Sequence, residues 1–350
     1  MWLSTVRNAG IALVPSLSQS WSVSESSKGE AMIGARLVQG TLIHEFEKGM
    51  VQVGSNPAHS VVFSGLSPIE VGWLRSLADR PPHGRPRAGS LSERQTEALA
   101  LLDTAGLLVR SVNPMHKVKV RIGQMDEVGV RVAKLLAESR AGGVEIRDGG
   151  NVDARTESLF PREYRGLPTK TSVRRVIKAI SPSTCTGKIA LPDVAVVCSD
   201  RVFDHGVLGR LLSCDTAHIP AVSDDRSVTV GPVVIPGRTA CSLCLDLHRR
   251  DNAPGWVKQC GALQQSEPAA PVPHIAATAA GIIVGLIDLL ANRGTEGVWM
   301  AVSAALPALA EQKDLAGGAS PVYHVTSYGV ETRACFPHPD CGCLALAKAS

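Results

Sequence analysis

The pattern of apolar and polar positions predicts a small mixed module in the first third of the chain. Apolar and polar residues alternate over residues 36–65, which is typical of β-strands separated by polar turns. Two helices follow, and each begins with a capping box, the first at Ser67 and the second at Ser92. Residues 107–112 then return as a strand. This order of elements predicts a winged-helix-like α+β module over residues 36–113.

The rest of the chain has the pattern of an α/β domain. Residues 117–122 predict a strand, residues 128–139 a helix, and residues 144–148 a second strand. Asp148 ends this second strand about twenty residues after the turn, which is the layout of a Rossmann-type nucleotide site. Further strands and helices follow, so residues 114–350 are predicted to form one Rossmann-like domain.

The turn that would hold nucleotide phosphates departs from the glycine-rich pattern. When Gly129 is placed as the last glycine of G-x-G-x-x-G, Gln124 and Asp126 stand at the other two glycine positions. The middle glycine lets the backbone approach a phosphate, so the Asp126 side chain obstructs this approach and adds a negative charge. Gly123 lies one place early and relieves the tight turn only in part. We therefore expect a Rossmann fold with a degraded phosphate site.

Four cysteines in two close pairs predict a metal site. Cys241 and Cys244 form a C-x-x-C pair, and Cys341 and Cys343 form a C-x-C pair much later in the chain. Each pair supplies two thiolates from one turn, which suits a tetrahedral structural zinc ion. A redox C-x-x-C needs no second pair, and the total of nine cysteines is odd for a disulfide framework. Zinc is the favoured prediction, with Cys335 as the one stand-in ligand.

Composition and charge limit the partners. Hydrophobic residues make up 44% of the 350 residues, charged residues make up 19%, and the net charge is only +4. A charge this small indicates neither nucleic acid nor a membrane surface as a partner. The second predicted helix carries Glu93, Glu97 and Asp103, whereas a helix that enters the major groove of DNA is basic. Free thiols together with a zinc site predict a reducing, cytoplasmic setting.

Two segments have features of targeting or membrane segments. Residues 1–35 contain a short apolar run with no small-x-small cleavage site after it, and we expect a disordered leader there. Residues 275–290 are apolar and rich in alanine and glycine. This stretch is shorter than the roughly 20 residues of a membrane-spanning helix and contains Asp288, so we expect a buried or interface helix.

A family pattern is carried by three stretches of the sequence. They are Gly-Pro-Val-Val-Ile-Pro-Gly-Arg-Thr-Ala-Cys-Ser-Leu-Cys at residues 231–244, Trp256, and the closing His-Pro-Asp-Cys-Gly-Cys at residues 338–343. Over residues 36–345 the chain resembles the ThiF/MoeB (E1-like) superfamily. Within it, the chain resembles most the actinobacterial branch of E1-like partner proteins of azole-forming cyclodehydratases. The resemblance implies a Rossmann-like E1 core with a zinc tetrathiolate, commonly assembled as a homodimer.

The resemblance also implies where ATP and Mg²⁺ would bind in an active member. Active members hold them with the glycine loop, an acidic residue, an Arg, a Lys and a later Asp, and they adenylate the C-terminal carboxylate of a small protein. Carried onto this chain, these roles match Gly123, Gly129, Asp148, Arg162, Lys170 and Asp200. The Leu-x-Arg-Gln run of active members is missing, because Leu159 is followed by Phe-Pro-Arg-Glu.

Each of these candidates has a structural alternative. Asp148 can cap the turn before Gly149-Gly150, and Asp200 can cap the helix that follows it. Arg162 and Lys170 can be solvated loop charges. Cys260 lies in a predicted loop where some E1 enzymes place a reactive cysteine, but its sequence neighbours include no base that would lower its pKa.

Two functions remain open after this comparison. In the azole-forming branch, ATP is used by a separate YcaO-type enzyme, and the E1-like protein binds the precursor peptide through an N-terminal winged-helix module like residues 36–113. The first hypothesis is therefore a non-catalytic partner that binds a peptide. The second is an active ATP-dependent adenylyltransferase that acts on a protein C-terminus. A DNA-binding regulator is disfavoured by the acidic second helix.

Overall fold

The computed structural model shows two compact units, residues 1–113 and 114–350. The residues that it describes are 35–56, 60–78, 91–109, 114–269, 271–294, 297–298, 301–302 and 318–344. The leader expected over residues 1–35 therefore lies outside the described residues, except for the buried Ala35. Each unit is considered by itself below.

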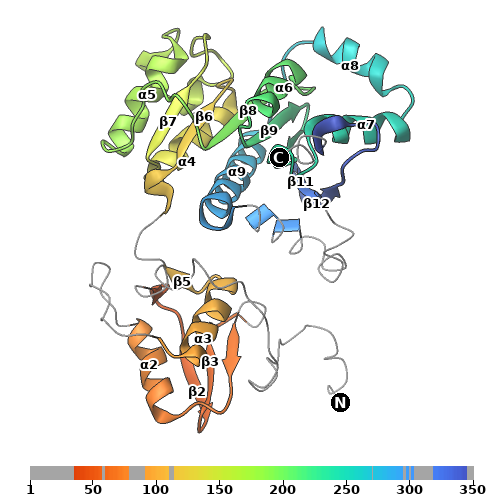
Figure 1. The fold of residues 1–350 in the computed structure, drawn as a ribbon. Helices are drawn as coiled ribbons and strands as arrows, with labels where there is room; N and C mark the ends of the chain where they lie inside the picture. The colour runs from red at the N-terminus through yellow and green to blue at the C-terminus, as the bar shows by residue number, and fades with distance from the viewer. Residues whose placement is uncertain are drawn as a thin grey trace, which may run out of the picture. The chain divides into compact units, whose positions relative to one another are not determined.

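The described residues of the small unit form two antiparallel sheets and two helices (Figure 1). Its elements are β1 (Arg36–Leu37), β2 (Ile43–Glu47), β3 (Met50–Val53), β4 (Val61–Phe63), α2 (Pro68–Ala78), α3 (Glu93–Thr104) and β5 (Leu108–Val109). Strand β1 pairs with β5, and a separate three-stranded sheet has the order β2-β3-β4. Its core includes the fully buried residues Val51, Val53, Leu77 and Leu102.

Both helices of the small unit begin with the predicted capping boxes. Ser67 Oγ accepts a hydrogen bond from the N–H of Glu70 at 3.3 Å, and Glu70 Oε2 accepts one from the N–H of Ser67 at 2.8 Å. Ser92 and Gln95 make the equivalent pair of bonds, at 3.2 and 3.0 Å, ahead of α3. Each box satisfies backbone donors that the first turn of a helix leaves free.

Over its described residues, the larger unit is an α/β domain with one mixed sheet (Figure 1). Its strands are β6 (Lys119–Ile122), β7 (Gly143–Ile146), β8 (Val194–Asp200), β9 (His218–Asp224), β10 (Ser227–Val230), β11 (Ser320–Thr326) and β12 (Gly329–Cys335). Its α-helices are α4 (Glu127–Glu138), α5 (Thr169–Ile180), α6 (His205–Ser213), α7 (Ser242–Asn252), α8 (Trp256–Gln264) and α9 (Pro273–Arg293). Short 3₁₀ helices span Pro114–Lys117, Glu157–Leu159 and Arg162–Tyr164.

The strand order of this sheet defines where a ligand can bind. The order is β12-β11-β10-β9-β8-β6-β7, in which β7, β6, β8 and β9 run parallel and the remaining strands are added antiparallel. The first parallel strand, β6, lies between β7 and β8, so the direction of strand addition reverses at β6. Open α/β sheets bind ligands at the carboxyl ends of strands at such a switch point.

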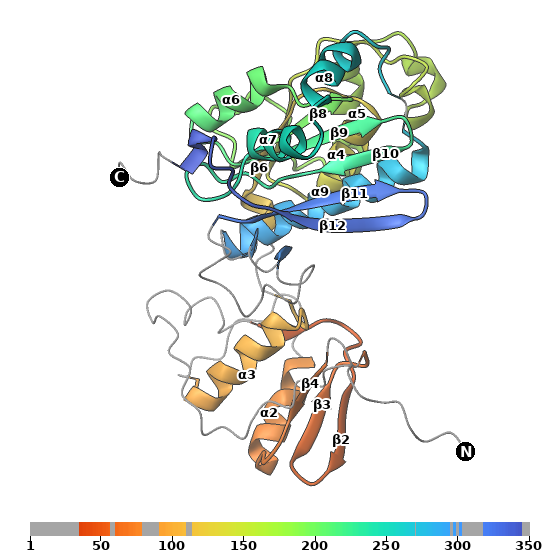
Figure 2. The same ribbon diagram turned by 90° about the vertical axis from the view of Figure 1, so that its right-hand side faces the viewer.

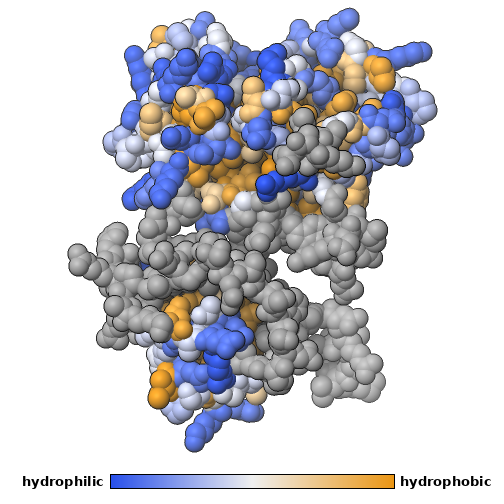
Figure 3. Space-filling model, in the orientation of Figure 1, coloured by the Kyte–Doolittle hydropathy of each residue, from blue (hydrophilic) through white to orange (hydrophobic). Residues whose placement is uncertain are grey.

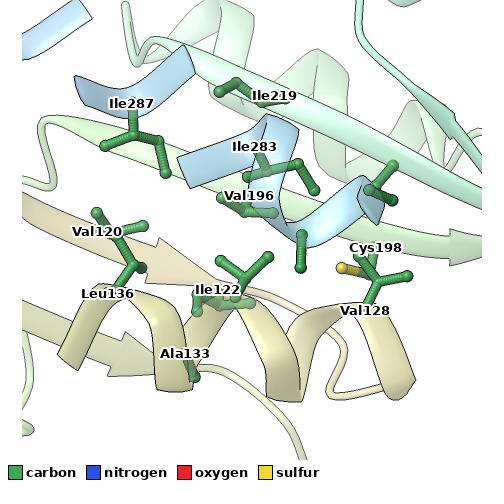
Figure 4. Packing of buried hydrophobic residues seen from close by; sticks show 14 of the residues in the cluster. Val120, Ile122, Val128, Ala133, Leu136, Val196, Cys198, Ile219, Ile283 and Ile287 are labelled. Atoms are coloured by element: carbon green, nitrogen blue, oxygen red, sulfur yellow. The ribbon is translucent and has the colours of Figure 1, made fainter. Parts of the chain in front are cut away.

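The main core lies between the sheet and the helices α4 and α9 (Figure 4). Val196 of β8 packs on this side with Ile122 of β6 and Ile283 of α9. The next residue, Val197, points to the opposite side, where it packs with Leu208 of α6. This alternation is the normal period of a strand, and it shows that helices cover both faces of the sheet.

Helix α9 is long and apolar enough, over Pro273–Asn292, to span a membrane by length and composition. One side of it is buried in the core, where Ile275, Ile283 and Ile287 have no exposed surface. Figure 3 shows hydrophobic residues gathered over this helix on the visible face of the larger unit. The buried side is the environment of a core helix, as the sequence predicted.

Candidate functional site

Four cysteine thiols converge at the start of α7. The Sγ atoms of Cys241, Cys244, Cys341 and Cys343 all lie within 4.8 Å of one another. The Sγ–Sγ distance is 3.6 Å between Cys241 and Cys341, and 3.5 Å between Cys244 and Cys343. The fold therefore brings together the two pairs that the sequence singled out.

These distances fit a tetrahedral metal ion. With metal–sulfur bonds of about 2.3 Å, the edge of a tetrahedron of four sulfurs is about 3.8 Å, close to the spacing found. The cysteines are free rather than disulfide-bonded. Three of the four are buried and Cys341 is half-buried. Since all four positions are filled by protein thiols, the site suits a structural metal rather than a catalytic one.

The two cysteine pairs are presented by short, local segments. Cys241 is the N-cap of α7, so Cys244 follows within the first helical turn. The C-terminal pair lies in a turn in which the N–H of Cys341 donates to the carbonyl oxygen of His338 at 2.9 Å. Two sulfurs from a helix start and two from a turn are a common way to build such a centre.

His338 orders the C-terminal turn and lies next to the cysteines. Its Nδ1 accepts a hydrogen bond from the N–H of Asp340 at 3.0 Å, and its Nε2 is 2.7 Å from Asp251 Oδ2. The predicted stand-in ligand, Cys335, is buried beside the cluster but is not one of the four converging thiols. Burial, with the nearby Cys244, raises the pKa of Cys335 to about 12, which keeps this thiol protonated.

A second group of polar residues lies at the switch point of the sheet. Gln124, just after β6, donates from Nε2 to Oδ2 of Asp200, the last residue of β8, at 2.8 Å. Arg155 places Nη1 3.9 Å from the same oxygen. Within the described part of the chain, two buried atoms of this group have no hydrogen-bond partner: Arg155 Nη1 and Asp200 Oδ1. Buried polar atoms are normally satisfied, so this group has spare capacity for a polar ligand.

A pocket of about 480 Å³ adjoins this polar group. Its wall is formed by residues 199–206 and by Leu263, Gln264, Ser266 and Pro268. It thus includes Ser199 and Asp200, whose buried oxygens lack hydrogen-bond partners among the described residues. Of the group at the switch point, Asp200 contributes to the wall of this pocket, whereas Gln124 and Arg155 do not.

The Asp126 carboxylate occupies the N-terminus of α4, where Rossmann proteins bind phosphate. Its Oδ1 accepts a hydrogen bond from the N–H of Gly129 at 2.8 Å, and its Oδ2 accepts one from Ser223 Oγ at 3.2 Å. Only 6% of Asp126 is exposed. Burial raises the pKa of this carboxyl to about 6 in spite of the bond from Gly129, and the charge of Asp200 adds to the rise. A negative group of the protein therefore fills the phosphate position.

The two predicted loop glycines, Gly123 and Gly129, differ in whether the structure has room for a side chain at their positions. A Cβ atom at Gly129 would lie 2.5 Å from the carbonyl oxygen of Gln124, too close for any other residue without a shift of the backbone. A Cβ atom at Gly123 would meet the carbonyl oxygen of Val196 at 3.7 Å, an ordinary contact. Gly129 therefore serves the close packing of α4, which is the role of the last glycine in the motif.

Asp148 and Asp200 occupy different settings from those expected. Strand β7 ends at Ile146, so Asp148 lies beyond the strand, where its Oδ1 accepts a hydrogen bond from the N–H of Gly150 at 2.8 Å. This local bond turns the chain before the strand can continue, as in the structural alternative. Asp200 does not cap α6, because that cap is Asp204, which accepts from the N–H of Val207 at 2.9 Å.

The predicted basic residues stay apart from the switch-point group. Arg162 is exposed in a short 3₁₀ helix, and Lys170 is half-buried in the first turn of α5. Neither is joined to Asp200 by a hydrogen bond or ion pair in the described structure, whereas Arg155 is within ion-pair distance. Sequence reasoning missed Arg155, although Asp153 two positions earlier was a signal. Asp153 Oδ1 accepts from the backbone N–H of Arg155 at 3.0 Å and so begins a tight turn that positions Arg155.

The loop predicted around Cys260 is wrong, because this residue lies in helix α8. Gly255 is the N-cap of this helix, and the ring of Trp256 packs under the guanidinium of Arg249 at 5.0 Å, which anchors the first turn. Burial, together with the charge of Asp246, raises the pKa of the Cys260 thiol. This thiol is therefore not activated as a nucleophile.

Comparison with known proteins finds relatives at the level of structure. No family model matches the chain, and neither does any curated protein. The crystal structure of E. coli MccB matches with a TM-score of 0.58 and 14% identity, over 89% of this chain and 96% of that chain. The microcin C7 biosynthetic enzyme MccB in complex with N-formylated MccA matches with a TM-score of 0.57 and 14% identity, over 89% and 99%. PaaA matches with a TM-score of 0.50 and 13% identity, over 84% and 97%.

These matches show the fold of the chain. The chain shares the fold of E. coli MccB, with one mixed sheet in the described part of its larger unit. The matched 89% of the chain exceeds the share of residues 114–350, so it extends into the small unit. The identity of 13–15% supports no conclusion beyond the fold.

Proposed function

We propose that this protein is an E1-like partner that binds a precursor peptide and supports its modification by a separate YcaO-type cyclodehydratase, without using ATP itself. The observation that carries this proposal is the Asp126 carboxylate at the N-terminus of α4. The attraction of a helix N-terminus for an anion is about 1 kcal/mol, and Asp126 already occupies it. A nucleotide phosphate would have to displace this buried carboxylate and approach its charge.

The small unit is the proposed peptide-binding module, and its assignment as winged-helix-like is part of this proposal. Strands β2 and β4 are the two edges of its three-stranded sheet, and an extended peptide can add to such an edge by backbone hydrogen bonds. Helix α3 has Glu93, Glu97 and Asp103 on a 12-residue segment, which is unfavourable for contact with phosphates of DNA. The MccB structures include complexes with the peptide MccA, which supports a peptide as the partner.

The remaining parts of the proposal concern the metal, the assembly and the location. The four cysteine thiolates would hold Zn²⁺, which favours tetrahedral sulfur sites and would fasten the C-terminal turn to α7. The protein would act as a homodimer in the cytoplasm, a compartment in which free thiols persist.

Calorimetric titration of the full, zinc-loaded chain with Mg-ATP tests the central claim. We expect no heat of binding from the natural protein and weak binding from Asp126→Ser, because serine keeps a helix cap and removes the charge. The matched control is Asp193→Ser. It removes a carboxylate that accepts a hydrogen bond from the N–H of Lys119, at the end of β6 remote from Asp126. Micromolar binding by the natural protein, lost on Asp200→Ala, would overturn the proposal.

Peptide binding is tested with a library of random displayed peptides selected on the full chain. Hydrogen–deuterium exchange then locates a selected peptide, and we expect protection of backbone amides in β2 or β4. Protection confined to the larger unit would show that the small unit is not the peptide-binding module.

A second function, that of an ATP-dependent adenylyltransferase acting on a C-terminal carboxylate, is favoured by the group at the switch point. Asp200 Oδ1 and Arg155 Nη1 are buried without hydrogen-bond partners in the described structure, as groups kept for Mg²⁺ and phosphate would be. MccB has also been solved with ATP. This function predicts exchange of labelled pyrophosphate into ATP that depends on an added peptide, and Asp200→Asn would abolish it. The absence of exchange with every peptide selected above would exclude it.

A further inference from the structure

The outer edge of β12 has no paired strand among the described residues of the sheet. Figure 2 shows β12 at the margin of the sheet, with β11 between it and β10. The hairpin that β11 and β12 form exposes large apolar side chains: Tyr328 at its tip is 99% exposed, Val330 is 45% exposed and Phe336 is 37% exposed. An exposed strand edge offers a row of free backbone donors and acceptors.

The register with β11 fixes which groups of β12 point outward. Pro321 of β11 lies opposite Ala334, and proline has no N–H, so this is a non-hydrogen-bonded pair. Hydrogen-bonded and non-hydrogen-bonded pairs alternate along an antiparallel ladder, and the register of this hairpin has no shift. The N–H and C=O groups of Val330, Thr332 and Ala334 therefore point away from β11.

We propose that two copies of this chain pair through β12, antiparallel and about a two-fold axis at Thr332. In this register the outward N–H and C=O groups of Thr332 face the same groups of Thr332 in the second copy. The outward groups of Val330 in each copy face those of Ala334 in the other. Each such pair can exchange two backbone hydrogen bonds, so the edge is matched to itself in backbone geometry. The inference specifies the interface of the homodimer proposed above and does not depend on peptide or nucleotide binding.

The side chains of β12 are complementary to themselves in the same register. Glu331 of each copy lies opposite Arg333 of the other copy, so the interface contains two cross-strand ion pairs. These side chains are 54% and 74% exposed and pair with each other within the strand at 2.7 Å, so they are free to exchange partners. The central Thr–Thr pair is also favourable on adjacent strands.

The exposed aromatic residues at the two ends of the hairpin follow the same symmetry. Tyr328 and Phe336 are equally distant from Thr332 along the chain, so the two-fold axis brings Tyr328 of each copy toward Phe336 of the other. Aromatic pairs of this kind stabilise neighbouring strands. A peptide of unrelated sequence could form the backbone hydrogen bonds but would lack the complementary charged and aromatic side chains. A second copy of this chain is therefore the proposed partner of β12.

Sedimentation velocity of the full chain over a range of concentrations tests the proposal. We expect the natural protein to dimerise and Glu331→Arg alone to dimerise roughly tenfold or more weakly, because it places like charges opposite each other twice. Arg333→Glu alone should be weakened for the same reason. Mixing the two variants should restore dimers, since each Arg of one then meets a Glu of the other. The matched control is Glu138→Arg, an exposed charge reversal on α4 that should leave dimerisation unchanged.

The outcome is decided by the pattern across these samples. A natural protein that stays monomeric at all concentrations would overturn the proposal, and so would a dimer that both single variants leave intact. Thr332→Pro is a second test of the interface, because it removes an outward N–H that makes no hydrogen bond to β11. It should abolish dimers while the circular dichroism spectrum and the zinc content stay unchanged. Failure of this interface would leave the ATP and peptide tests unaffected.

Discussion

The buried carboxyl of Asp126 should make the stability of the larger unit depend on pH near neutrality. Its pKa in the folded protein is raised by burial from 3.8 to about 6, while in the unfolded chain it has the ordinary value. Between these two values the folded state binds more protons than the unfolded state, so stability falls as pH rises through this window. A difference of about two pKa units corresponds to roughly 3 kcal/mol.

The variant Asp126→Asn isolates this effect. Asparagine is an equally good helix cap and can still accept from the N–H of Gly129, but it does not ionise. We expect the free energy of unfolding of the natural protein, relative to this variant, to fall by about 2 kcal/mol between pH 4 and pH 7, which is the larger part of the full difference. Urea denaturation followed by tryptophan fluorescence at a series of pH values measures this difference, and carboxylates that behave alike in both proteins cancel.

A direct titration gives an independent measurement. The carboxyl carbon of Asp126, assigned by its loss in Asp126→Asn, should shift in an NMR titration with a midpoint near pH 6. A midpoint below pH 4, or identical pH dependence of stability in the two proteins, would refute the reasoning. It would mean that Asp126 is ionised without a penalty, and that it is better solvated than its 6% exposure indicates.

Three further predictions concern the metal site, the loop glycines and a buried ion pair. Cys244→Ser should lower the zinc content measured by atomic emission and reduce the melting temperature, and full zinc content in a folded variant would contradict the tetrathiolate. Gly129→Ala should destabilise the protein by about 2 kcal/mol, because its Cβ would lie 2.5 Å from a backbone oxygen, whereas Gly123→Ala should be tolerated; equal melting temperatures would contradict this difference. Arg121→Met should cost about 2 kcal/mol at pH 7, since it removes one of the two arginines that pair with the buried Glu145, the one at 2.9 Å, and leaves only the more exposed Arg147 at 2.7 Å. Burial opposes ionisation of Glu145, but the bond to Arg121 holds its pKa below the usual value, so this cost should shrink as pH falls below about 4.

Much of the larger unit could be predicted because its signals are local and strong. The strand, helix and strand at the start of the unit were recognisable from their periodicity, and β6, α4 and β7 confirm them. The zinc-type cysteine spacing was informative for a similar reason. Each pair is set by one turn, so only the meeting of the two turns depended on the fold.

The candidate nucleotide residues were harder to predict because their roles depend on contacts between distant segments. Asp200 lies just before the segment predicted to be helical, which favoured it as the N-cap of α6. The helix begins later, at His205, so Asp204 is its N-cap. Arg155 and Arg162 are both loop arginines, and only a tight turn begun by Asp153 decides which one approaches Asp200. Helix α8 was missed because the contact that anchors it comes from Arg249 on the preceding helix α7, which the local sequence does not reveal.

The position of the cysteines along the chain has a consequence for synthesis. Cys241 and Cys341 are 100 residues apart, so at a synthesis rate of 5–20 residues per second the first pair waits about 5 to 20 s for the second. During that interval the first pair holds only half of a site, and a metal ion bound there lacks two of its ligands. A chain that breaks off before Cys341 never completes the centre. Since metal binding contributes folding energy, such fragments would stay less stable than chains that extend past Cys343, and they would be open to proteases.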